Sequence, residues 1–244
     1  MAKPKYKRVL LKLSGEALQG EREAGIDFEA TLSLAKEISK VLGLGVEVAI
    51  VCGGGNLFRG RSGAKHGMDE ATGDYIGMMA TMMNALALQN ALENLNIPTR
   101  VLTALETQRI AEPYIRRRAL RHMEKGRVVI CAGGTGSPFF TTDTAGVLRS
   151  IELKCDIMLK CSNVDGVFSA DPKENPEAKQ FKNISYEDVI SKRLNALDMT
   201  AVSLAREKNL PIIVFDIFKP GNLQDAVSKD NVGTRIGQSP VAKS

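Results

Sequence analysis

Residues 126–146 read GRVVICAGGTGSPFFTTDTAG, so an apolar run is followed at once by glycines, hydroxyls and a carboxylate. Glycines let the backbone approach an anion without a Cβ in the way. Hydroxyl groups that can donate hydrogen bonds lie at Thr135, Ser137, Thr141 and Thr142. A helix that begins near Thr142 would point free backbone N–H groups at a ligand. The segment therefore predicts a strand, a phosphate-binding loop and a helix in succession.

The same succession of strand and helix runs through the rest of the chain. Apolar, strand-like runs lie at residues 8–13, 46–52, 99–104, 127–132, 156–161 and 211–217. Segments with helical spacing lie at about residues 28–42, 70–95, 113–125, 142–154 and 198–209. Apolar strands joined by helices predict an α/β fold with a mainly parallel sheet and helices on both faces. Ligands are then expected at the carboxyl ends of the strands.

The chain has no clear interdomain linker, so residues 1–244 are predicted to form a single domain. Residues 232–237 are expected to be the last edge strand of the sheet. The polar tail at about 238–244 is expected to be disordered.

Composition narrows the class of protein and of ligand. The longest apolar runs are far shorter than the roughly 20 residues that a membrane span needs, and the charged N-terminus lacks an apolar signal core. We therefore expect a cytoplasmic protein without membrane contact. The four cysteines show no C-x-x-C spacing and there are only two histidines, which argues against a metal site. A net charge of +5 favours anionic ligands, but the charge is too dispersed to indicate nucleic acid.

Two further segments place a cation and glycines directly after a strand. The first strand ends in Lys12-Leu13-Ser14-Gly15, where the Lys12 ammonium can hold phosphate oxygens, although alone it reads more readily as a solvated lysine. The second strand is followed by Gly53-Gly54-Gly55-Asn56, and Arg59 then adds a bidentate phosphate donor. A flexible loop with a solvated arginine is the alternative there.

Two other features have a structural and a functional interpretation. The segment Lys160–Pro172 joins a lysine at a strand end to an Asp165-Gly166 turn and Phe168, which fits either the binding of a nucleoside and its phosphates or a plain hairpin. Asp74 near a helix start either complements the helix dipole or binds a ribose. Neither a Walker sequence nor a Rossmann fingerprint is present, so a P-loop kinase is excluded.

Five of these motifs occur together and in one order. They are LKLSGEAL at 11–18, GGGNLFRG at 53–60, Gly73-Asp74, TGSPFFTTD at 135–143 and VDGVF at 164–168. In this the chain resembles the bacterial uridylate kinases of the amino acid kinase superfamily, over nearly its whole length. The resemblance implies a three-layer αβα sandwich that transfers the γ-phosphoryl group of ATP to UMP as a homohexamer. Ser137 stands where related sequences often have asparagine, so the base contacts are expected to be rearranged.

The resemblance also implies site residues. ATP would be bound by Lys12, Leu13, Ser14, Gly15, Gly55, Arg59, Ser162, Asn163, Phe168 and Asp171. UMP would be bound by Gly54, Asp74, Thr135, Gly136, Ser137, Pro138, Phe139, Phe140, Thr141 and Thr142. The catalytic residues would be Lys12, Arg59, Asp143 and Lys160. Asp143 would orient the lysines, no general base is needed, and Mg²⁺ would be carried mainly by the phosphates.

Control by GTP as activator and UTP as inhibitor is a further implication of the resemblance. The residues concerned would be Gly20, Glu21, Arg22, Glu23, Ala24, Gly25, Arg100 and Arg127. Two alternatives to a UMP kinase stay open. One is a superfamily kinase that acts on a carboxylate or carbamate, and the other is a nucleotide-responsive protein that touches DNA through the basic segment 116–122.

Overall fold

A computed structural model describes residues 3–59, 67–170, 174–175, 177–194, 196–229 and 231–238. Its strands are β1 (Arg8–Leu13), β2 (Glu47–Cys52), β3 (Thr99–Thr103), β4 (Glu112–Pro113), β5 (Val128–Ala132), β6 (Ile157–Ser162), β7 (Asn183–Ser185), β8 (Ile212–Asp216) and β9 (Thr234–Gly237). Its helices are the 3₁₀ helix η1 (Gly15–Leu18), α1 (Phe28–Leu42), α3 (Glu70–Glu93), α4 (Arg116–Glu124), α5 (Thr142–Glu152), α6 (Tyr186–Ser191), α7 (Met199–Lys208) and α8 (Asn222–Ser228). Asp171 and residues 239–244 of the predicted tail lie outside the described residues.

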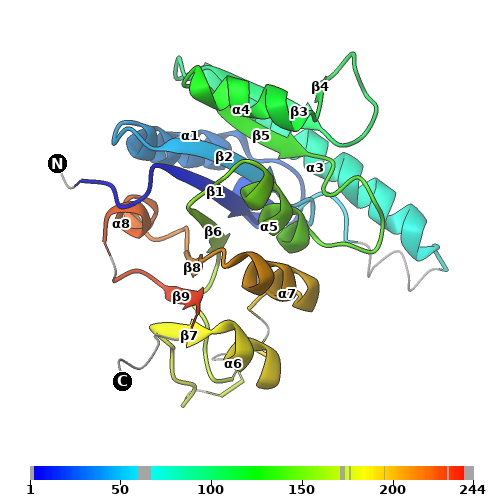
Figure 1. Cartoon of the computed structure of the whole chain (residues 1–244). Coiled ribbons are helices and arrows are strands. Elements are labelled where there is room, and N and C mark those ends of the chain that lie inside the picture. Colours follow the sequence, from blue (N-terminus) through cyan, green and yellow to red (C-terminus); the bar gives the residue numbers. More distant parts are fainter. Residues whose placement is uncertain are drawn as a thin grey trace.

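All the strands belong to one sheet (Figure 1), in the order β4-β3-β5-β2-β1-β6-β8-β9-β7. The strands from β4 to β8 in this order are parallel to one another. The predicted mainly parallel sheet is therefore confirmed. The expectation that residues 232–237 form an edge strand is wrong, because β9 pairs antiparallel with β8 and also pairs with β7 on its other side.

Two apolar cores, one on each face of the sheet, make this a three-layer αβα sandwich. Val9, Leu11 and Leu13 of β1 pack in the core that also contains residues of α1, α3 and α8. Leu10, between them, packs in the other core with residues of α4, α5, α6 and α7. Because side chains alternate along a strand, Lys12 faces the same side as Leu10 and meets α5.

Side-chain caps fix where the helices next to the carboxyl ends of the strands begin. Thr141 accepts a hydrogen bond from the amide of Asp143 at 3.0 Å, as the N-cap of α5. Asp198 accepts one from the amide of Ala201 at 2.9 Å, as the N-cap of α7. Such caps contribute about 1 kcal/mol each and start both helices at the same edge of the sheet. No helix in the described part of the chain is long and apolar enough to span a bilayer.

Candidate active site

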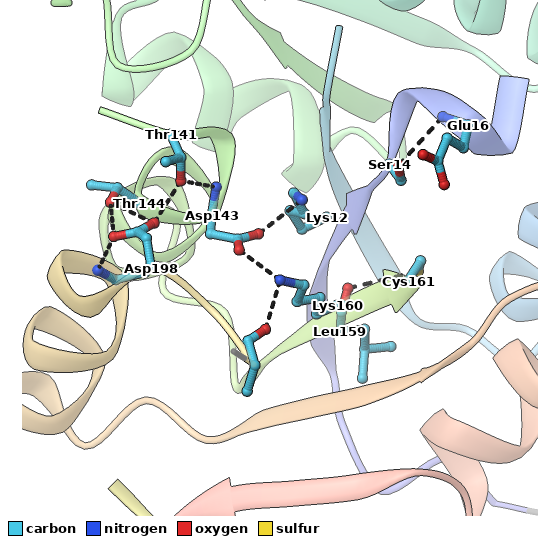
Figure 2. Close-up of polar contacts among 12 residues, drawn as sticks. Lys12, Ser14, Glu16, Thr141, Asp143, Thr144, Leu159, Lys160, Cys161 and Asp198 are labelled. Carbon is cyan, nitrogen blue, oxygen red and sulfur yellow. Dashed lines mark hydrogen bonds and ion pairs between the residues drawn. The ribbon is translucent and has the colours of Figure 1, made fainter. Parts of the chain in front are cut away.

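Two lysines and one aspartate meet at the carboxyl ends of β1 and β6. Lys12 and Lys160 are register partners on these adjacent parallel strands, so their side chains leave the same face of the sheet. Asp143, in the first turn of α5, lies between them (Figure 2). The Nζ of Lys12 is 2.8 Å from Oδ1 of Asp143, and the Nζ of Lys160 donates a hydrogen bond to Oδ2 at 2.6 Å. We call these three residues the lysine–aspartate cluster.

The cluster is buried and carries an excess of positive charge. Burial by itself would raise the pKa of Asp143, but Lys12 and Lys160 outweigh it and hold the pKa below its ordinary value. For Lys160 burial is the largest influence and lowers the pKa of its ammonium, while Asp143 opposes that change. With both lysines protonated the cluster has one net positive charge, which suits an anionic group such as phosphate.

Neighbouring residues set the positions of the two lysines. Gly146 of α5 lies over the stem of Lys12, where an added Cβ would be 2.9 Å from Sδ of Met158 and 3.3 Å from Cγ of Lys12. A glycine there lets α5 approach β1 closely enough for Asp143 to reach the ammonium. Lys160 is held from the other side, since its Nζ also donates to the carbonyl of Ala196 at 2.7 Å.

Asp198 belongs to this site, although the sequence did not single it out. Its carboxylate accepts hydrogen bonds from the Thr141 hydroxyl at 2.5 Å and from the Thr144 hydroxyl at 2.9 and 3.0 Å. Asp198 therefore ties the first turn of α5 to the start of α7 (Figure 2). An N-cap signal precedes α7 in the sequence, but nothing in it shows that the same carboxylate binds α5.

Two cavities reach the cluster. The first, of about 460 Å³, is lined by Lys12, Thr141, Thr142, Asp143, Lys160, Leu197 and Asp198. The second, of about 330 Å³, is lined by Lys160 and by Ser162, Val164, Gly166, Phe168 and Val214 among others. Lys160 lines both cavities, so a ligand in the second cavity can present an anionic end to Lys160. The arrangement can bring a donor and an acceptor together.

The glycine loop after β2 is packed tightly against its neighbours. A Cβ at Gly15 would be 2.3 Å from Oδ1 of Asn56, and one at Gly54 would be 2.8 Å from Cβ of Ala80 in α3. Asn56 is fixed in turn by Asn84, with hydrogen bonds of 2.7 and 3.0 Å between the two amides. The loop is thus a rigid part of the site.

The loop after β5 joins the predicted UMP-binding residues to α3. Asp74 of α3 accepts a hydrogen bond from the amide of Phe139 at 2.6 Å. Phe139 has a φ of +71° and its side chain is largely exposed, an unusual backbone conformation for a bulky residue. Thr135 closes the loop on the other side, since its hydroxyl donates to the carbonyl of Ser137 at 2.9 Å.

Known proteins resemble this chain over nearly its whole length. The sequence model of the amino acid kinase family matches residues 7–216. The chain belongs to the amino acid kinase family. The structure of UMP kinase from Bacillus anthracis is 41% identical, with 96% of this chain and 97% of that one covered and a TM-score of 0.93. The structure of UMP kinase from Ureaplasma parvum is 36% identical, with 96% of this chain and 100% of that one covered and a TM-score of 0.90. The structure of uridylate kinase from Archaeoglobus fulgidus is 30% identical, with 94% of this chain and 99% of that one covered and a TM-score of 0.73.

The residues expected to take part in control by GTP and UTP do not form one cluster within the described part of the chain. Gly25 lies beside the glycine loop, where its amide donates to the carbonyl of Asn56 at 2.8 Å. Arg100 and Arg127 lie at the opposite edge of the sheet, at the amino ends of β3 and β5. There Arg127 contacts Nδ1 of His122 at 3.0 Å, and Nε2 of His122 is 3.2 Å from Glu112.

Proposed function

We propose that this chain is a UMP kinase, which transfers the γ-phosphoryl group of ATP to UMP and yields UDP and ADP. The observation that carries this proposal is the lysine–aspartate cluster, where one cavity is lined by both buried ammonium groups and a second cavity meets it at Lys160. The acceptor is supported by the UMP and uridylate kinases that the chain resembles at 30–41% identity.

In this mechanism the phosphate of UMP is itself the nucleophile, so no side chain needs to remove a proton. Its oxygen attacks the γ-phosphorus in line, the bond to the β-phosphate oxygen breaks, and ADP leaves. Lys12 and Lys160 stabilise the negative charge on the transferring group, and Asp143 keeps both ammonium groups directed at it. Arg59 positions phosphate next to the line of transfer.

The substrates have separate places in the proposal. ATP occupies the cavity beside Phe168, with its phosphates on Lys12–Gly15, Gly55 and Arg59. UMP lies along Gly54, Asp74 and residues 135–142. The carboxylate of Asp143 forms ion pairs with two ammonium groups. The carboxylate of Asp198 accepts hydrogen bonds from two hydroxyls and a backbone amide. We therefore expect Mg²⁺ to be carried mainly by the ATP phosphates, where it would neutralise their charge.

A coupled assay of ADP release with UMP, CMP and acetylglutamate as acceptors tests the function. We expect turnover with UMP to exceed turnover with acetylglutamate by at least about 10²-fold, because the proposed acceptor loop at residues 135–142 is assigned to a nucleoside monophosphate. Turnover with CMP measures how strictly the enzyme selects the base. Activity with acetylglutamate alone would overturn the proposal. Salt-dependent DNA binding without any turnover would instead favour a regulatory protein. The same assay with GTP or UTP added tests the proposed activation and inhibition.

We also propose that the chain forms a homo-oligomer in the cytoplasm, expected to be a hexamer. Tyr75, Met79 and Met83 follow one another at four-residue intervals on α3. Their exposed fractions are 47%, 61% and 54%, respectively. They form an apolar stripe on one face of the helix.

The double substitution Met79→Glu and Met83→Glu should reduce the mass of the assembly in solution, because it would place carboxylates in an apolar contact. Light scattering after size-exclusion chromatography measures this. Phe28→Glu, which changes another exposed apolar residue (69% exposed) on α1, is the control and should leave the mass unchanged. An unaltered mass in the double variant would show that the stripe is not the interface.

A further inference from the structure

Glu16 of η1 joins the loops on either side of β1. Its Oε1 is 3.1 Å from Nη2 of Arg59, which follows β2. Its Oε2 accepts a hydrogen bond at 3.1 Å from the side-chain amide of Asn163, which follows β6. Each carboxylate oxygen therefore holds one loop, and the two loops carry residues that the proposed function assigns to ATP.

The backbone of Glu16 is itself fixed. Its amide donates to the hydroxyl of Ser14 at 3.3 Å, and its carbonyl accepts from the amide of Gln19 at 3.1 Å. Gly15 beside it packs so closely that a Cβ would meet Asn56. The backbone of Glu16 is thus held in place, and its carboxylate contacts the side chains of Arg59 and Asn163.

Arg59 gains its orientation from this contact. The side chain is 61% exposed, and a solvated arginine samples many rotamers. Here its Nε donates to the carbonyl of Gly55 at 3.2 Å and its Nη2 to Glu16. Over the part of the chain that the structure describes, these contacts leave Nη1 available for an anion. The two acceptors, the carbonyl of Gly55 and the carboxylate of Glu16, therefore fix the orientation of the guanidinium.

We propose that Glu16 is a positioning residue that acts through Arg59 in phosphoryl transfer, an inference that rests on the proposed UMP kinase activity. Both carboxylate oxygens of Glu16 are already engaged by Arg59 and Asn163, so direct binding of ATP is not the role of Glu16. Its effect is to hold Arg59 in the orientation that the transferring phosphate needs. The effect should therefore disappear when Arg59 is absent.

A double-mutant cycle tests this role. Glu16→Ala should lower kcat about 10-fold with little change in KM for ATP, and Arg59→Ala should lower kcat about 100-fold. The double variant should then be no more than about 3-fold slower than Arg59→Ala, because both substitutions remove the same contribution. Glu16→Gln, which keeps a hydrogen-bond acceptor, should recover part of the loss.

The controls separate this role from fold and from function. Glu29→Ala removes an exposed carboxylate from the first turn of α1; it should leave kcat unchanged and lower the melting temperature only slightly. The Glu16 variants should also keep the wild-type melting temperature. Additive losses in the double variant, or a faster Glu16→Ala enzyme, would overturn the positioning role while UMP kinase activity stands. An inactive wild-type chain would overturn the proposed function, and this role with it.

Discussion

Lys12→Ala is expected to lower kcat with UMP about 10³-fold. The ammonium of Lys12 is one of two that face the transferring group, and removing one preorganised donor of this kind costs a factor of about 10²–10³. Lys160 is close by but already donates to Asp143 and to the carbonyl of Ala196, so it cannot replace Lys12. The coupled assay at saturating ATP and UMP measures the loss. The affinity for ATP should change less, because the Lys12 contact matters most in the transition state.

Two further variants show whether the charge or the packing of Lys12 matters. Lys12 is only 9% exposed, so Lys12→Ala also leaves a cavity next to α5. Lys12→Met fills that space without the charge, and the same loss of kcat in both variants would identify the ammonium as the essential group. Lys36→Ala, at an exposed position on α1, serves as the control. Turnover of Lys12→Ala within a few-fold of wild type would refute the role of Lys12.

Much of the fold was predictable because its longer elements have strong periodic patterns. The strand predicted at 127–132 is β5 (Val128–Ala132), and the helix predicted to begin near Thr142 does so because Thr141 caps it. Some of the short elements, β4 and α8 among them, were not predicted. β4 has two residues, and α8 begins after Gly221, which has a φ of +83° and makes no side-chain cap. Such elements leave too few residues for a period to be recognised.

Part of the site was predictable, because ligands of parallel α/β sheets bind at the carboxyl ends of the strands. Lys12 and Lys160 were found from their places at the ends of apolar runs. That both lysines meet at Asp143 was expected only from the family resemblance, because it depends on β1 and β6 being neighbours. Asp198 was missed for a similar reason, since its partners Thr141 and Thr144 lie far away in the sequence. The roles of the predicted binding residues stay predictions until ligands are tested.

Asp143→Asn should reduce both activity and stability. The substitution leaves two buried ammonium groups without their counter-charge, and breaking a buried ion pair costs about 3–5 kcal/mol. We expect a value of about 3 kcal/mol, at the lower end of that range, because the adjoining cavity lets water reach the lysines. Urea unfolding at pH 7 measures the free energy of unfolding. We expect kcat to fall about 10²-fold, since the lysines would no longer be directed at the phosphate.

The pH dependence of this stability difference distinguishes the charge of Asp143 from its shape. Lys12 and Lys160 hold the folded-state pKa of Asp143 below its ordinary value of 3.8. Stabilisation by Asp143 is therefore complete well above pH 3.8 and is lost as the pH falls through the folded-state value. The difference between wild type and Asp143→Asn should shrink in the same direction. A difference that stayed constant down to about pH 3 would mean that the introduced amide disturbs packing, and that the ion pairs contribute little.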